Sequence, residues 1–437
     1  MLSVVTAKLL PFCRGLFTRL DARTLGLLGF FITITTAWLR GLNSTSIPDA
    51  KGYIQQAIGM LKGWEYITNN PDQFGHGLGF SALIAITFFV TNSESLVLFK
   101  IILAVLNGLS AYLLARVGQE VGLKPTYWKL ASIALILDPF VLFAATDVQT
   151  ECITTTLSIY WAYMYLQTRA SRLVQINILL FGLLGFYTVV MRPNSLLPLA
   201  LVSLLIFFKW LKEKLYLRSI AISAGIFLSL ISLYEVLITR MYAGFVFLTP
   251  IGGYSSVYMC KKELIPQYLG IISKSENDKI NLFVNSGSGG VNQILEQFAG
   301  QSVSTVNSQM YNLGKSICLA NPLESLEVLM IKALALWRPF TVFGAYSWQI
   351  FLFSLILWLP LTITAVIYLT RKSLNKSEKD LRRYFLILSV GYTISLLLTP
   401  TQIRHRIAIA EPFYWLFLFH FISINWVRFK SKIFKIE

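Results

Sequence analysis

The sequence predicts an all-α, polytopic integral membrane protein with about ten transmembrane helices and two interfacial helices. Composition gives the first two observations: of 437 residues, 55% are hydrophobic and only 14% are charged, and the mean hydropathy is +0.62. The third is that apolar runs almost free of charge recur along the chain, since a hydrocarbon core about 30 Å thick needs roughly 20 such residues per helix. Together these observations exclude an ordinary soluble globular protein.

Ten apolar runs are interpreted as membrane-spanning helices. The first follows a basic N-terminal segment, and no small-residue cleavage site comes after it, so it is expected to be a retained helix. The runs cover residues 25–42, 96–117, 130–145, 152–167, 173–191, 195–208, 219–239, 346–370, 384–399 and 407–427. A further run, 78–91, is shorter and is expected to lie on the membrane as an interfacial helix.

The placement of basic residues decides which loops share a compartment. The formal net charge is +17, from 38 Lys and Arg against 21 Asp and Glu. If the 78–91 run does not cross the bilayer, most of these cations fall in short loops on the side of both termini, as the positive-inside rule requires. We therefore expect cytoplasmic termini in a plasma (inner) membrane. The charge excess is then explained by topology, and no nucleic-acid partner is expected.

This topology divides the chain into three parts. Residues 1–239 form a transmembrane module whose first outside loop, 43–77, is expected to carry catalytic residues. Residues 240–347 form a large extracytoplasmic loop with an interfacial helix expected at 326–343, and residues 348–437 supply the C-terminal transmembrane helices. Cys260 and Cys318 share the large loop, so one disulfide between them is conceivable.

Acidic side chains at the expected outer helix ends are the first candidates for chemistry: Asp49, Asp147 and Glu151. A carboxylate at a membrane surface can act as a general base, a metal ligand or an ion-pair partner, or it can merely solvate its loop. Two separate loops bring these acids to one membrane face, where a lipid substrate with a polar head would be processed. This convergence favours a functional role.

Cationic side chains are also expected at the outer helix ends, at the same membrane depth as the acids. Arg192 precedes Pro193, and Arg404, His405 and Arg406 form a cluster near the outer end of the ninth run. The rigid fork of Arg matches phosphate oxygens. Because the positive-inside rule disfavours cations on this side, binding of a phosphate headgroup would explain their presence. The alternative is that they snorkel or pair with phosphates of the bulk lipid.

Other chemical motifs are not found in the sequence. Three histidines occur without an H-E-x-x-H pattern, so a zinc hydrolase has no support, and there is no P-loop sequence. No cofactor is expected, and a divalent metal is possible but unsupported by these residues. Asp138, which precedes Pro139 inside the third run, could cap a broken half-helix.

Four short patterns occur along the chain in an order that is known from a protein family. They are Pro48-Asp49-Ala50-Lys51-Gly52-Tyr53, the loop from Pro139 through Asp147 to Glu151, the pair Arg192-Pro193, and Arg404-His405-Arg406 followed by Glu411-Pro412. This order resembles the GT-C superfamily of membrane glycosyltransferases, in particular the dolichyl- or polyprenyl-phosphate-mannose-protein mannosyltransferase-like group, glycosyltransferase family 39. The chain departs from that family at His76-Gly77-Leu78, where relatives have Pro-Pro-Leu.

The resemblance implies an inverting glycosyltransferase that moves a sugar from a polyprenyl-phosphate donor to a glycan, lipid or protein acceptor at the extracytoplasmic face. Asp49 would be the catalytic carboxylate, and Glu151 would position the acceptor or the sugar beside it. The resemblance and the charge pattern together give the expected substrate-binding residues as Tyr53, His76, Asp147, Arg192, Arg404, His405 and Arg406. Membrane lipids are the other expected partners.

Two further classes of protein fit the sequence. A transporter or flippase for a lipid-linked or amphiphilic substrate would use the same cations but need no catalytic base. It would depend on charges within the bundle such as Asp138 and would tolerate Asp49→Asn, whereas sugar transfer predicts the reverse. A non-catalytic membrane scaffold would tolerate both changes.

Overall fold

The computed structural model describes residues 17–46, 48–63, 77–167, 172–212, 217–242, 244–248, 256–257, 259–262, 265, 301–340, 348–372, 374–397, 406 and 408–433. Every regular element in these ranges is a helix, which confirms the all-α class. In chain order they are α2 (Ala22–Leu39), α3 (Pro48–Lys62), α5 (Leu78–Thr91), α6 (Val97–Glu120), α7 (Pro125–Leu137), α8 (Pro139–Thr146), α9 (Glu151–Leu166), α10 (Arg172–Met191), η2 (Pro193–Ser195), α11 (Leu196–Lys212), α12 (Leu217–Met241), α17 (Val303–Ala320), α18 (Pro322–Trp337), α19 (Trp348–Thr370), α20 (Lys376–Leu397) and α22 (Glu411–Ile433).

Several of these helices can cross a membrane. Five are long and apolar enough by length and composition, namely α2, α6, η2 with α11, α12 and α19, and the bent pair α7 and α8 is a sixth. Helix α12 exposes Leu228, Leu233 and Leu237 by 57–60% each. Apolar surface of this extent is rare on soluble monomers and is what a lipid environment requires. The chain is a polytopic membrane protein.

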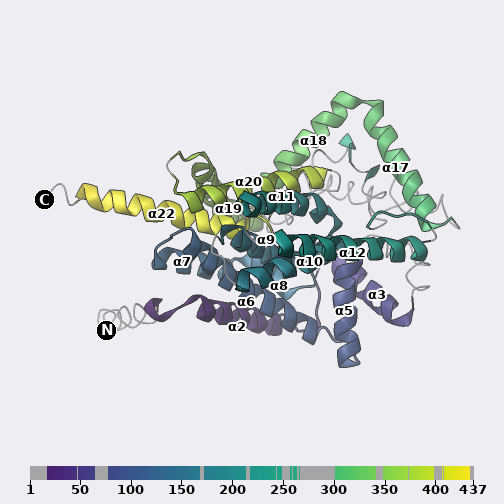
Figure 1. Ribbon diagram of the computed structural model, residues 1–437, viewed down its shortest axis with the longest axis horizontal. Coiled ribbons are helices and arrows are strands. Elements are labelled where there is room, and N and C mark those ends of the chain that lie inside the picture. The colour runs from purple at the N-terminus through teal and green to yellow at the C-terminus, as the bar shows by residue number, and fades with distance from the viewer. Residues whose placement is uncertain are drawn as a thin grey trace.

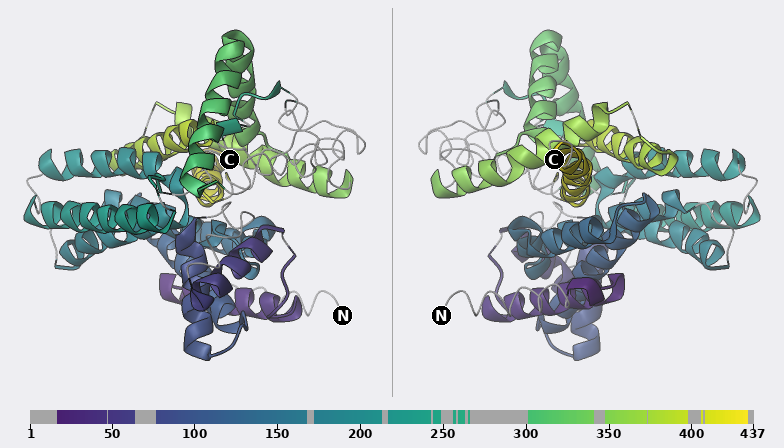
Figure 2. Two further views of the ribbon diagram at one scale, coloured as in Figure 1. Left: turned by 90° about the vertical axis from the view of Figure 1, so that its right-hand side faces the viewer. Right: turned by 90° about the vertical axis from the view of Figure 1, so that its left-hand side faces the viewer.

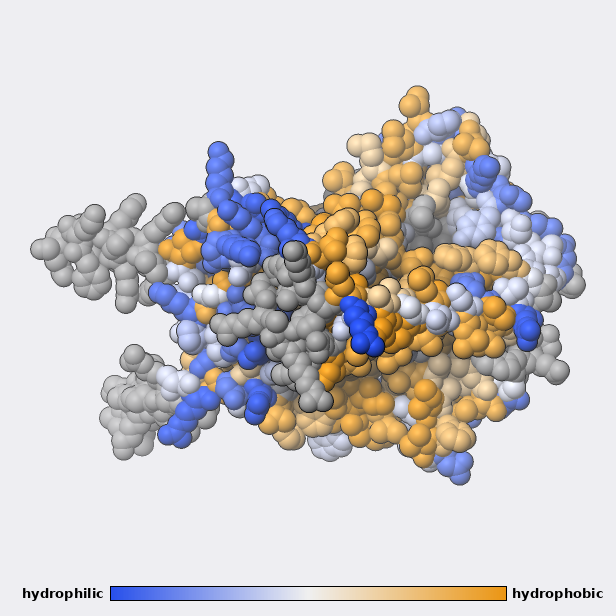
Figure 3. All heavy atoms as spheres, viewed as in Figure 1, coloured by the Kyte–Doolittle hydropathy of each residue, from blue (hydrophilic) through white to orange (hydrophobic). Residues whose placement is uncertain are grey.

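The surface of the protein has distinct hydrophobic and hydrophilic regions. Figure 3 shows hydrophobic residues over the middle of the molecule and hydrophilic residues gathered toward the end at which α22 finishes. The first turn of α2 and the last turn of α22 lie at that same end in Figure 1. Helix α2 therefore begins on the side of the bundle where α22 ends.

Helices α5, α17 and α18 run at an angle to the bundle. Figures 1 and 2 show α5 standing at a steep angle to α2 and α12, and they show α17 and α18 rising away from the bundle. Helix α5 has the predicted bounds of 78–91, whereas α18 spans Pro322–Trp337 and not the predicted 326–343. Pro322 explains the earlier start, because proline is favoured in the first turn of a helix, where its missing N–H is not needed.

The third predicted span is broken at Asp138. Helices α7 and α8 meet there at an angle of 53°. The carboxylate of Asp138 accepts hydrogen bonds from the backbone N–H groups of Phe140, at 2.9 Å, and Val141, at 3.1 Å. Pro139 cannot continue a helix from the preceding turn, so the cap and the proline together start a new one. This confirms the prediction that Asp138 caps a half-helix.

The predicted disulfide in the large loop is also present. Cys260 and Cys318 are bonded and join residues 259–262 to the end of α17. Ser256 donates a hydrogen bond to the backbone oxygen of Met310, at 3.0 Å, so a second contact ties the same segment to α17. The segment after α12 is thus fastened to the arm that α17 and α18 form.

Candidate functional site

The predicted acids of the second loop lie at one end of the bundle, which we call the site end. It is formed by the last turns of α2, α8 and α10 and the first turn of α9. Asp147 follows α8, and Glu151 begins α9 four residues later. Both side chains are buried, with 1% and 4% of their surface exposed. Buried carboxylates need partners, and each has a different arginine.

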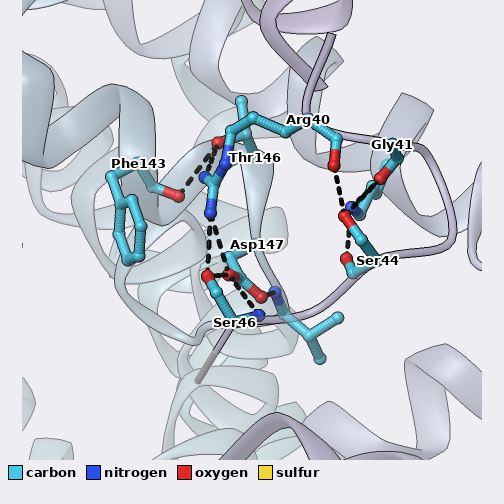
Figure 4. Close-up of polar contacts among 9 residues, drawn as sticks. Arg40, Gly41, Ser44, Ser46, Phe143, Thr146 and Asp147 are labelled. Carbon is cyan, nitrogen blue, oxygen red and sulfur yellow. Dashed lines mark hydrogen bonds and ion pairs between the residues drawn. The ribbon is translucent and has the colours of Figure 1, made fainter. Parts of the chain in front are cut away.

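Asp147 is paired with Arg40, a residue that the sequence analysis did not single out. Nη2 of Arg40 lies 3.2 Å from Oδ2 of Asp147, and Nη1 donates to the hydroxyl of Thr146 at 2.5 Å. Figure 4 shows the guanidinium between the α8 end and the chain that leaves α2. The same guanidinium stacks over the ring of Phe143, 4.4 Å from its centroid. Arg40 therefore contacts the second loop from three sides.

Asp147 also holds the chain that leads to Asp49. Its Oδ2 accepts from the backbone N–H of Ser46, at 3.1 Å, and from the Ser46 hydroxyl, at 2.5 Å. Oδ1 accepts from the backbone N–H of Val148 at 2.8 Å. Both carboxylate oxygens are thus engaged inside the protein, with Arg40, Ser46 and Val148 as partners.

Glu151 is paired with Arg192. Nη2 of Arg192 lies 3.4 Å from Oε1 of Glu151, and the arginine is 8% exposed. Within the described residues, Nη1 of Arg192 has no hydrogen-bond partner. A buried guanidinium nitrogen without a partner costs free energy, so it calls for a partner from outside the described residues, such as water, an ion or a ligand. Arg192 therefore keeps an edge that could meet an anion, and Nη2 of Arg406 is unpartnered in the same sense.

Asp49 and Tyr53 lie on α3, which the sequence analysis treated only as part of an outside loop. Asp49 is half-buried in the first turn of the helix, where a carboxylate is favoured by the helix dipole. Tyr53 packs edge-on against Phe80 of α5 with ring centroids 4.7 Å apart. Ser81 of α5 donates to Gln56 of α3 at 2.5 Å. Tyr53 is thereby engaged in packing, and α3 is fixed on α5.

Helix α5 in turn lies against the segment that carries Arg192. A Cβ atom added to Gly77 would lie 2.5 Å from the backbone oxygen of Met191, and one added to Gly79 would lie 2.7 Å from its backbone nitrogen. Only glycine permits so close an approach of two backbones. The helix of Asp49 is therefore joined to the Arg192–Glu151 pair by way of α5, and to Asp147 by way of Ser46.

Of the C-terminal cation cluster, the structure describes Arg406. Arg406 is fully buried: Nε donates to Oε1 of Glu411 at 3.1 Å, and Nη1 donates to the backbone oxygens of Trp337 and Arg338. Its guanidinium stacks over Trp358 at 4.6 Å. Arg406 thus joins the end of α18 to the start of α22. Arg404, His405 and His76 lie outside the described residues.

Across the described ranges, no three His, Cys, Asp or Glu side chains are grouped so that they could hold a metal ion. Asp147 and Glu151 each face an arginine. A guanidinium supplies the positive charge that a carboxylate pair would otherwise take from a cation.

No protein-family model matches the chain, and neither a curated protein nor a solved structure matches it. One signal in the sequence could have indicated Arg40. It lies near the expected outer end of the first apolar run, 25–42, where the positive-inside rule disfavours a cation, as it does for Arg192 and the C-terminal cluster.

Proposed function

We propose that the protein is a ten-span membrane glycosyltransferase of GT-C type that takes a sugar from a polyprenyl-phosphate donor at the extracytoplasmic face. The observation that carries the proposal is the buried guanidinium of Arg192, with Nη1 unpartnered among the described residues, beside the carboxylate of Glu151. Such a group suits an anionic phosphate ester. The acid-bearing helix α3 is held against the same corner through α5 and Ser46.

The disulfide supports an extracytoplasmic location of the site end. Disulfides persist in oxidising compartments and are rare in the cytosol. Cys260 and Cys318 lie between the last turn of α12 and the first turn of α19. If α10, α11 and α12 each cross the bilayer, the last turns of α10 and α12 face one side. The site end then shares a compartment with the disulfide, and the basic loops lie opposite.

The reaction uses residues in three roles. Asp49 accepts the proton of the acceptor hydroxyl while the hydroxyl oxygen attacks the anomeric carbon and the bond from that carbon to the phosphate oxygen breaks. The phosphate then carries the developing negative charge, which Arg192 stabilises because its guanidinium is fixed in advance. Glu151 orients Arg192 and faces the sugar or the acceptor. Among the predicted cations we assign this role to Arg192, because Arg406 already binds Glu411 and two backbone carbonyls through Nε and Nη1.

The test compares glycolipids and surface glycans by mass spectrometry in cells with the wild-type protein, no protein, Asp49→Asn, Arg192→Ala or Asp380→Asn at equal abundance. Asp380 is the matched control, because it is a buried acid paired with Lys209 at 3.0 Å, away from the site end. We expect one sugar unit to disappear and its polyprenyl carrier to accumulate in the null, Asp49→Asn and Arg192→Ala cells but not in Asp380→Asn cells. Normal glycans in Asp49→Asn cells would contradict the proposal.

One observation favours the transporter or flippase reading as a second candidate. The break at Asp138 gives a discontinuous span, and half-helix ends of this kind line substrate sites in transporters. Trp415 donates to the second oxygen of Asp138 at 3.0 Å, so α22 contacts the break. Transport predicts that Asp138→Asn abolishes function while Asp49→Asn is tolerated, and the same set of cells distinguishes the two.

A further inference from the structure

We propose that Arg40 and Asp147 form a positioning clamp that sets where Asp49 lies relative to Glu151 and Arg192. This inference rests on the proposed function and adds two residues to it. Neither residue would touch substrate: they would act through Ser46, which Arg40 and Asp147 both contact. Figure 4 shows this junction, in which the chain leaving α2 meets the end of α8.

The clamp joins the two loops that carry the acids. Asp147 accepts both the backbone N–H and the hydroxyl of Ser46, although the two residues are 101 positions apart in the sequence. Asp49 follows Ser46 by three residues, which limits the distance between their Cα atoms to about 11 Å. On the other side, Glu151 follows Asp147 by four residues. One carboxylate thus fixes the starting points of both acid-bearing segments.

Arg40 completes the clamp by contacting both loops. Nη2 donates to the Ser46 hydroxyl at 2.8 Å, and Nη1 donates to Thr146 at 2.5 Å, so one guanidinium contacts both loops. Arginine suits this task because its donors have a fixed planar geometry. Lysine would reach one of these oxygens at a time.

The turn before Ser46 is held independently. Lys100 of α6 donates to the backbone oxygens of Gly41, at 3.0 Å, and Ser44, at 2.7 Å. Gly41 has a φ of +89°, a conformation that glycine adopts without strain. Residues 41–46 are therefore fastened at three points before α3 begins. A connection with no catalytic consequence would not need this many buried charged contacts, since each carries a desolvation cost.

The first experiment measures initial rates on the full chain in proteoliposomes, with a synthetic polyprenyl-phosphate sugar and the acceptor fraction identified by the glycan comparison. Misplacement by about 1 Å can cost roughly 100-fold in rate, so we expect Arg40→Ala and Asp147→Asn each to lower kcat by about that factor. KM for the donor should change by less than about threefold, because the clamp does not contact substrate. Arg40→Lys should recover part of kcat, and Ser46→Ala, which keeps the backbone donor, should lose less than Asp147→Asn.

The second readout needs no substrate. Hydrogen–deuterium exchange should accelerate in residues 44–55 of Arg40→Ala and Asp147→Asn, while residues 190–195 keep the wild-type rate. Lys209→Ala is the control, because it breaks a buried ion pair with Asp380 elsewhere and should leave both segments unchanged. The double variant should be no worse than the poorer single one, as expected for two residues acting as a unit.

The outcomes separate the clamp from the function on which it rests. An active wild-type enzyme whose Arg40→Ala variant keeps kcat and wild-type exchange would overturn the clamp and leave the glycosyltransferase proposal intact. A rise in donor KM without loss of kcat would instead make Asp147 a substrate contact and also overturn the clamp. A wild-type protein that moves no sugar would overturn the function and the catalytic role of the clamp together, whatever the exchange rates.

Discussion

Nη2 of Arg406 lies 3.0 Å from Oε1 of Glu411, and neither side chain has any exposed surface. The same guanidinium donates to the carbonyls at the end of α18, where Arg338 caps the helix. This one side chain therefore connects the arm formed by α17 and α18 with the start of α22. The hydrogen bonds of this guanidinium run through Nε and Nη1, whereas Nη2 has no hydrogen-bond partner within the described residues.

The pair gives the first prediction, which concerns stability. Removing one partner of a buried ion pair leaves an uncompensated charge, so Arg406→Met and Glu411→Gln should each lower the free energy of unfolding by about 3–5 kcal/mol. Thermal midpoints of the purified protein in detergent would measure this. If Arg406→Met kept the wild-type midpoint yet lost sugar transfer, Arg406 would regain the phosphate-binding role first assigned to it.

Gly79 gives the second prediction. An alanine Cβ there would lie 2.7 Å from the backbone nitrogen of Met191, too close for α5 and α10 to keep their contact. Gly79→Ala should displace α5, and with it α3 and Asp49, so transfer activity should fall by an order of magnitude or more, in line with the cost of about 1 Å of misplacement.

Gly225→Ala is the matched control for Gly79. It lies inside α12 with nothing within 4 Å of an added Cβ, so alanine should be neutral or slightly stabilising there. Equal activity of the two variants would show that the close approach of α5 to Met191 does not matter for the site.

Local patterns in the sequence were sufficient for some of the helical elements, although α3 and α17 fell within predicted loops. The apolar run 78–91 became α5 with the same bounds, and Asp138 with Pro139 marked the break between α7 and α8. Both signals act within a few residues, since a helix is specified by its own caps and apolar content. The disulfide of Cys260 and Cys318 was likewise readable, because these are the cysteines that share one loop.

Contacts between distant segments could not be read in this way. Arg40 and Asp147 are 107 positions apart, and nothing local to either residue specifies the other. The sequence therefore indicated the acids but not which of them were already occupied. Asp147 looks like a free binding group in a linear reading, and only the packing of α2 on α8 shows that both of its carboxylate oxygens are used inside the protein. Arg406 likewise binds Glu411 and the end of α18 through Nε and Nη1, which no local pattern indicates.

Lys332 gives the third prediction, on pH. This lysine of α18 is buried and donates to the backbone oxygen of Leu397, at 2.6 Å, and its burial lowers the pKa of the ammonium to about 7. The undocked lysine regains a pKa near its ordinary value of about 10.4 and binds a proton that the docked one has released. Docking of α18 on α20 should therefore strengthen as pH rises from about 7 to 10, by at most about 1.4 kcal/mol per pH unit.

Thermal midpoints between pH 6.5 and 9.5 would test this. The wild-type midpoint should rise with pH relative to that of Lys332→Met, which cannot titrate at this position. Parallel pH profiles for the two proteins would show that Lys332 keeps the same protonation state whether or not α18 is docked.

The disulfide gives the fourth prediction, which decides what holds the arm to the segment after α12. Lys262 and Glu324 also connect the two, at 2.8 Å, and this contact lowers the pKa of the Glu324 carboxyl. Because both groups meet solvent, water screens the pair and it contributes little to stability. The disulfide closes a loop with a sequence separation of 58, for which chain entropy gives about 4 kcal/mol of stabilisation.

The double variant Cys260→Ser, Cys318→Ser should therefore make the arm far more sensitive to protease than Lys262→Ala does. Cys152→Ser is the control: it removes a buried free thiol and should behave as wild type. If Lys262→Ala were the more sensitive protein, the ion pair with Glu324 and not the covalent link would hold the arm in place.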